Sequence, residues 1–113
     1  SMQPMLNLIS AVSNKAFPDL PLVNRVVTAM PRGGGSDHVP FNAVGVPAFF
    51  WDEQGTQDYD FVHHTQNDTV ALIPEKYLVQ SATNEAVAAF IVACAQEMMP
   101  RDVPPTPPTA PGR

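Results

Sequence analysis

Basic residues are scarce in this sequence. Six lysines and arginines are spread along 113 residues against eleven aspartates and glutamates, so the formal net charge is -5. Phosphate recognition requires clustered Lys and Arg side chains, because these neutralise the backbone charges of DNA and RNA. The composition therefore argues against a protein that binds nucleic acid.

Long apolar runs are also missing. The longest, residues 86–95, is about half of the roughly 20 residues that a membrane-spanning helix requires, so we expect no membrane span and predict a buried core helix there. Cys94, the only cysteine, lies in this run. It cannot form a disulfide within the chain, and we expect it to be a small buried side chain rather than a reactive thiol.

The two ends of the chain are expected to lie outside the folded part. Residues 1–2 resemble the Ser-Met pair left when a purification tag is cleaved, and they are excluded from fold reasoning. Residues 100–113 contain six of the thirteen prolines and almost no large apolar side chain, which predicts a disordered Pro-rich tail. The alternative is that this tail is a ligand for an aromatic groove in another protein.

Two helices and two strands are predicted between those ends. Apolar residues at helical spacing predict a first helix over about residues 4–15. Short apolar segments bounded by prolines predict strands at about 24–30 and 46–51. Residues 74–98 are predicted to form one long helix, which begins at a proline and stops before Pro100. Apolar strands between helices indicate an α/β layer.

The long terminal helix is apolar around most of its circumference in its second half. Five residues are expected to line one face: Leu78, Ala82, Ala86, Phe90 and Ala93. Such a helix needs cover on more than one side, and the predicted elements offer little surface for this. We therefore expect the cover to belong to sequence outside this chain, or the exposed face to drive self-association.

Three histidines and a glycine-rich segment carry the candidate chemistry. In "GGGSDH", Ser36, Asp37 and His38 follow three glycines, where they either form a flexible turn or line an active site. A relay of Ser36, Asp37 and His64 is disfavoured, because the sequence has no G-x-S-x-G elbow. Zinc binding fits the histidines better, since neutral imidazole is a common zinc ligand.

His63 and His64 are adjacent, and we expect one of them at most to bind a given ion. Neighbouring side chains point to opposite faces of an extended segment, so one histidine is the ligand candidate and the other is its neighbour. Asp68 either forms a turn or holds the loop that presents the ligand histidine.

Two motifs occur in order along residues 33–98, "GGGSDHVPFNAVGVPAFF" and "HHTQNDT", followed by the apolar terminal helix. They resemble the C-terminal part of the M28 family of zinc-dependent exopeptidases, the aminopeptidase and carboxypeptidase Q group. In that family a Ser-Asp-His-x-x-Phe segment leads to Gly-[Val/Ile]-Pro, and a later His-[Thr/Ser]-x-x-Asp-[Thr/Asn] carries the last metal ligand. The paired histidines and the closing "EMMPR" are closer to the carboxypeptidase Q-like branch.

The resemblance implies an α/β/α sandwich with a mixed sheet, of which residues 3–99 would form the C-terminal segment, and a site for two zinc ions. Only His64 carries over as a ligand, because it stands directly before the Thr of the second motif. Four other residues are expected behind the ligands or near the substrate: Asp37, His38, His63 and Asp68. In the family the other ligands and the general-base glutamate come earlier in the chain.

One histidine cannot hold a hydrolytic zinc ion, which needs several ligands to acidify its bound water. The family's Glu-Glu pair is not found among the glutamates of this chain: Glu53, Glu75, Glu85 and Glu97. A site built within the chain from His38, His64 and Asp37 or Asp60 has enough donors, but its spacing matches no known zinc pattern.

The sequence therefore predicts a fragment of an exopeptidase that cleaves terminal peptide bonds, with zinc as cofactor and the remainder of its domain as partner. Alone, the fragment is expected to be inactive. The alternative is a non-catalytic binding or assembly module of the same fold. A third option is that the Pro-rich tail is the functional element. Localisation is left open by the sequence, and the resemblance favours a secreted or periplasmic protein.

Overall fold

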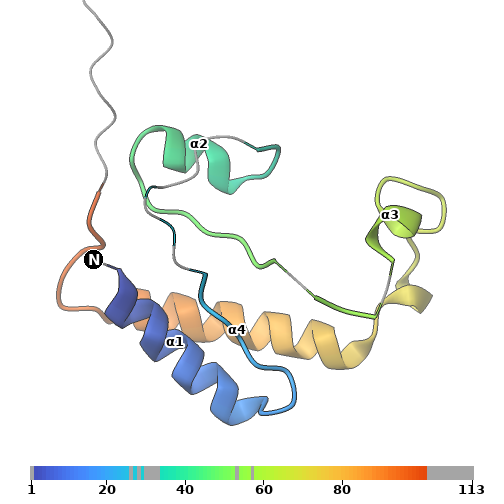
Figure 1. Cartoon of the computed structure of the whole chain (residues 1–113), viewed down its shortest axis with the longest axis horizontal. Coiled ribbons are helices and arrows are strands. Elements are labelled where there is room, and N and C mark those ends of the chain that lie inside the picture. The colour runs from blue at the N-terminus through green and yellow to red at the C-terminus, as the bar shows by residue number, and fades with distance from the viewer. Residues whose placement is uncertain are drawn as a thin grey trace, which may run out of the picture. The chain divides into compact units, whose positions relative to one another are not determined.

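The computed structural model describes residues 2–25, 27, 29, 34–52, 54–56 and 58–101, so most of the predicted tail lies outside the described residues. Its helices are α1 (Gln3–Ala16), α2 (His38–Ala43), α3 (Tyr59–Val62), the short 3-10 helix η1 (Val70–Leu72) and α4 (Glu75–Ala93) (Figure 1). The chain divides into a first unit, Ser1–Arg25 with Trp51–Glu97, and a second unit, Val26–Phe50 with Met98–Arg113. None of the described helices is long and apolar enough to cross a membrane.

α1 confirms the predicted first helix. Pro4 stands in its first turn, where a missing backbone N–H costs no helical hydrogen bond. Lys15 lies in the last turn, where a positive charge is favoured by the negative end of the helix dipole. The helix stops before Pro18, and the N–H of Phe17 makes the last bond, to the carbonyl of Ser13 at 3.0 Å.

α4 confirms the second predicted helix but is shorter than expected. It begins after Pro74 and has Glu75 in its first turn, where the positive end of the helix dipole stabilises a negative charge. Cys94 forms its C-terminal cap and is exposed, so the prediction of a buried cysteine is wrong. If the helix continued to residue 98, Glu97 would lie at its negatively polarised C-terminus, which is electrostatically unfavourable. The helix therefore ends earlier.

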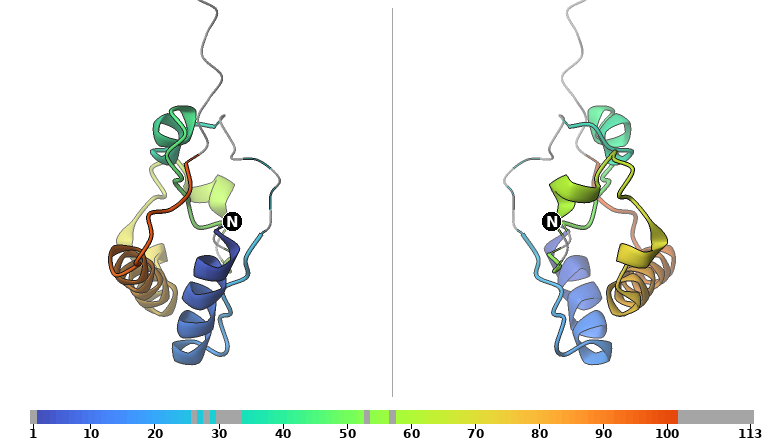
Figure 2. Two further views of the ribbon diagram at one scale, coloured as in Figure 1. Left: turned by 90° about the vertical axis from the view of Figure 1, so that its left-hand side faces the viewer. Right: turned by 90° about the vertical axis from the view of Figure 1, so that its right-hand side faces the viewer.

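α1 and α4 pack side by side (Figure 2). Ile9 is 5% exposed and is the one large hydrophobic side chain that is buried within the described residues. Two polar side chains are buried as deeply, Ser13 of α1 at 2% and Asn84 of α4 at 5%. The first unit therefore has almost no apolar core, and burial within it contributes little hydrophobic stabilisation.

The predicted core face of α4 is exposed. All five residues expected to be covered are accessible to solvent: Leu78, Ala82, Ala86, Phe90 and Ala93. Phe90 is 70% exposed and Leu78 56%. The side of α4 that faces the rest of its unit is mixed: Asn84 is buried there, Nε2 of Gln80 donates to the carbonyl of Leu20 at 2.7 Å, and Val87 and Ile91 are half-buried. Periodicity predicted an apolar face but contained no information on what covers it.

The predicted α/β/α sandwich is wrong for the described residues, which contain helices and no strand. Residues 46–52 have no regular secondary structure. Part of the other predicted strand, 24–30, lies outside the described residues, and its described positions form no strand. An extended segment becomes a strand only when a neighbouring strand pairs with its backbone N–H and C=O groups. Among the described residues, no strand pairs with either segment.

The backbone groups of Leu22 bond to a side chain of α1 instead of to a neighbouring strand. Its N–H donates to Oδ1 of Asn14 at 2.6 Å, and its carbonyl accepts from Nδ2 of the same side chain at 3.2 Å. Close by in sequence, Nδ2 of Asn24 donates to Oγ of Ser10 at 3.1 Å. Polar side chains of α1 thus hold the segment that follows the helix, because they satisfy the groups that a strand partner would otherwise bind.

Asn42 organises the second unit. It is 1% exposed, and its Oδ1 accepts from the N–H of Ala48 at 2.9 Å while its Nδ2 donates to the Ala48 carbonyl at 3.1 Å. The turn between them passes through Gly45 at φ 78°, a left-handed conformation that favours glycine. The N–H of Val46 donates to the carbonyl of Phe41 at 3.0 Å. One buried amide therefore joins both ends of the turn.

Replacing Asn42 with alanine is expected to open this turn. The change leaves the Ala48 N–H and C=O without their protein partner, at a cost of about 1–2 kcal/mol. Hydrogen exchange of the Ala48 amide should therefore become about fivefold to thirtyfold faster. Asn42→Asp keeps an acceptor for that N–H and serves as the matched control, with a smaller acceleration. Unchanged exchange in Asn42→Ala would contradict the assignment.

Candidate functional site

The candidate ligand His64 follows α3 in the first unit. α3 is a single turn, begun by Asp58, whose carboxylate accepts from the N–H groups of Asp60 at 3.1 Å and Phe61 at 3.4 Å. A side chain that accepts from the free N–H groups of the first turn is a strong helix start. The turn ends as the N–H of His63 donates to the carbonyl of Tyr59 at 2.8 Å.

Thr65 and Asn67 close the loop around His64. Oγ1 of Thr65 donates to a backbone carbonyl of α3, at 2.9 Å from Phe61 O and 3.0 Å from Val62 O, and accepts from the N–H of Asn67 at 3.1 Å. Nδ2 of Asn67 also donates to the Phe61 carbonyl, at 3.3 Å. These bonds tie the residues on both sides of His64 back to α3.

His64 has a backbone conformation that is uncommon for a residue with a Cβ atom. Its φ is 57°, the one positive value among the described residues other than glycine. A residue in this left-handed region carries a conformational cost, which persists only where the surrounding structure imposes it. The hydrogen bonds of Thr65 and Asn67 provide that constraint.

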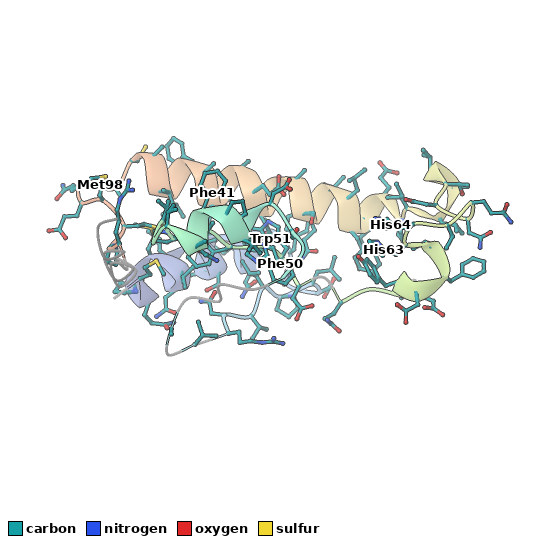
Figure 3. The ribbon with its side chains drawn as sticks, turned by 90° about the horizontal axis from the view of Figure 1, so that it is seen from above. Phe41, Phe50, Trp51, His63, His64 and Met98 are labelled. Atoms are coloured by element: carbon teal, nitrogen blue, oxygen red, sulfur yellow. The ribbon has the colours of Figure 1, made fainter. Side chains whose placement is uncertain are left out.

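The backbone turn at His64 brings two imidazoles together. The rings of His63 and His64 stack with centroids 3.9 Å apart and an interplanar angle of 21° (Figure 3). The ring of Tyr59 stacks on His63 from α3, at 4.5 Å and 21°. The prediction that the two histidines point to opposite faces is therefore wrong, because it assumed an extended backbone, and φ 57° at His64 removes that alternation.

The side chain of Asp68 makes neither of its expected contacts within the described residues, although its backbone closes a turn. It is exposed, and its hydrogen bond is made by the backbone, from its N–H to the carbonyl of Thr65 at 3.2 Å. The loop is held by Thr65 and Asn67 instead. The sequence contained a signal for this role of Thr65, because Thr hydroxyls commonly bond the backbone N–H two residues later and so form a turn.

Asp37 and His38 belong to the second unit, whereas His64 belongs to the first. Asp37 is exposed and precedes α2 without capping it through its side chain. His38 is half-buried and stacks on Phe50, with centroids 4.9 Å apart, and its buried Nδ1 has no hydrogen-bond partner.

The donors of this chain do not fit a zinc ion by themselves. Zinc in proteins takes three or four protein ligands. Among the residues that the structure describes, no three histidines, cysteines, aspartates or glutamates lie close enough together to hold a metal ion. The alternative of a site built from His38, His64 and Asp37 or Asp60 therefore has no support, and the ligand role of His64 requires donors from elsewhere.

A shallow groove lies between α1 and α4 in the first unit. It has a volume of about 530 Å³ and is lined by Thr83 and six apolar residues: Leu8, Val12, Ala86, Val87, Phe90 and Ile91. No ionisable group lines it, so it offers no general acid, base or metal ligand. The groove continues the exposed apolar face of α4.

Comparison with known proteins gives one informative similarity. The chain is similar to Aminopeptidase YwaD of Bacillus subtilis (strain 168), with 31% identity over 77 residues that make up 66% of this chain and 17% of that protein. No family model and no solved structure match the chain. The chain thus spans less than a fifth of the length of its relative. It contains a region related to an aminopeptidase.

Proposed function

We propose that this chain is the C-terminal part of a zinc-dependent exopeptidase of the M28 family, in which His64 supplies one metal ligand. The carrying observation is the geometry of the His64 loop, where hydrogen-bonded neighbours hold the residue at φ 57°. Residues with energetically costly backbone conformations cluster at functional sites. The similarity to an aminopeptidase and the order of the two sequence motifs support the same assignment.

The complete enzyme would hydrolyse a peptide bond at a chain end. Zinc, with two ions in the complete site, would polarise the scissile carbonyl and lower the pKa of the attacking water. The other ligands and the general-base glutamate would come from residues outside this chain. Asp37, His38, His63 and Asp68 would stand behind the ligands or near the substrate. The name of the relative favours cleavage at the amino end.

The exposed face of α4 supports a fragment role. Phe90 and Leu78 are more than half exposed, whereas the polar side chain of Asn84 on the same helix is buried. Each large apolar side chain that becomes buried contributes about 1.5–3 kcal/mol. In the complete protein the remainder of the peptidase domain would cover this face, because most of the relative's length has no counterpart in this chain.

Zinc analysis and a peptidase assay test the proposal on this chain and on the longer protein side by side. We expect the longer protein to retain zinc after dialysis and to cleave peptides, since it would hold the full ligand set. The 113-residue chain alone should retain no stoichiometric zinc and show no hydrolysis above that of its His64→Ala variant. Peptides blocked at one end or the other identify which terminus is read.

Tight stoichiometric zinc on the short chain would contradict the proposal. A longer protein that folds but binds no zinc and cleaves nothing would favour the second candidate, a non-catalytic binding or assembly module. The observation in favour of that candidate is the uncovered apolar face of α4, a typical feature of interaction surfaces.

A further inference from the structure

We propose that His63 is a positioning residue that fixes the imidazole of His64 by stacking, with Tyr59 supporting it from α3. The three rings form one column, with centroid distances of 4.5 Å and 3.9 Å and interplanar angles of 21° at both steps. This inference rests on the proposed ligand role of His64. It assigns His63 a specific task, holding the ring of its neighbour.

The side chain of His64 needs such a partner because it is exposed. An exposed histidine samples several rotamers about χ1 unless a contact selects one. A stacked aromatic pair favours its bound geometry by roughly threefold to tenfold beyond simple burial. The ring of His63 lies between those of Tyr59 and His64, so its own orientation is restricted on both faces.

The usual device for orienting a metal-binding histidine is a hydrogen bond from its second ring nitrogen to a carboxylate or carbonyl. Within the described residues the ring of His64 contacts the ring of His63 and has no hydrogen bond. Stacking therefore takes the place of that hydrogen bond in this loop. The left-handed backbone at His64 is what permits it, since an extended backbone would separate the two rings.

Side-chain scalar couplings of His64, measured by NMR on the metal-free 113-residue chain, test the orienting role directly. We expect couplings of a single χ1 rotamer in the natural chain and in His63→Phe, which retains an aromatic ring at this position. His63→Ala should give couplings averaged over two or more rotamers. Phe61→Ala removes an exposed aromatic from the same helical turn but outside the column, and it should behave like the natural chain.

Two NMR results would overturn the inference. One is a single retained rotamer in His63→Ala, and the other is averaging in His63→Phe as strong as in His63→Ala. A natural chain that already shows averaged couplings would overturn it as well, because no orientation would then exist to be maintained.

A chelator competition with zinc in the longer protein separates this inference from the proposed function. His63→Ala should weaken zinc binding by about tenfold, and His63→Phe should stay within about twofold of the natural protein. If His64→Ala leaves zinc affinity unchanged, the ligand role fails while the NMR result on orientation stands. If His64→Ala weakens binding and His63→Ala does not, the positioning role is wrong.

Discussion

Replacing His64 with alanine in the proposed complete peptidase is expected to lower the rate of peptide hydrolysis by about 100-fold or more. Metal-ion stabilisation of the transition state contributes several kcal/mol, and each 1.4 kcal/mol corresponds to a factor of ten. Losing one imidazole should weaken or empty the zinc position that it completes. Both kcat with a peptide substrate and bound zinc after dialysis should therefore fall together.

The neighbouring residue Gln66 offers a matched control for this variant. It is exposed in the same loop, and its side chain makes none of the bonds that hold the loop. Gln66→Ala should leave activity and zinc content near those of the natural protein. A His64→Ala enzyme that retains full activity would contradict the ligand assignment, whereas an equal loss in both variants would indicate a damaged loop.

Self-association of the 113-residue chain is the second large effect that we expect. The exposed face of α4 combines Phe90, at 70% exposure, with Leu78 at 56% and Val79 at 49%. Apolar surface of this extent is unfavourable in water and promotes contact between copies. In a symmetric dimer each substitution acts twice, so Phe90→Asp should weaken association by about 100-fold or more.

Sedimentation velocity over a concentration series measures this effect. Ala11→Asp is the control, because Ala11 is exposed on α1, outside the groove-lining residues, and receives the same added charge. It should associate like the natural chain. A natural chain that stays monomeric at high concentration, or an Ala11→Asp variant that dissociates as Phe90→Asp does, would show that the α4 face does not drive contact.

The loop around His64 illustrates what single-sequence reasoning missed. Its histidines were identified as the chemical feature of the chain, and the motif "HHTQNDT" indicated which one precedes the Thr. Asp68 was expected to hold the loop, yet Thr65 and Asn67 make the bonds. Asp, Asn and Thr side chains compete for the same few backbone groups of a turn. Their hydrogen bonds are similar in energy, so the sequence does not reveal which of them forms.

The strands were the larger error, and the reason is physical. Residues 46–51 are apolar enough for a covered strand, but a strand is defined by pairing with a neighbour that is often distant in sequence. Helices α1 and α4 were predicted well because their hydrogen bonds are local and their ends are fixed by Pro4, Pro18 and Pro74. Interactions between residues close in sequence can be predicted from the sequence, whereas the partner of a strand cannot.

The sequence alone therefore determined two helices, predicted an apolar face on the second one, and identified His64 as the residue to test. The tertiary structure decided which side of α4 is covered, that no described segment forms a strand, and that His63 stacks on His64. These features depend on contacts between residues and on a left-handed backbone at one position. Composition and spacing do not specify either of them, because both arise only when the chain folds back on itself.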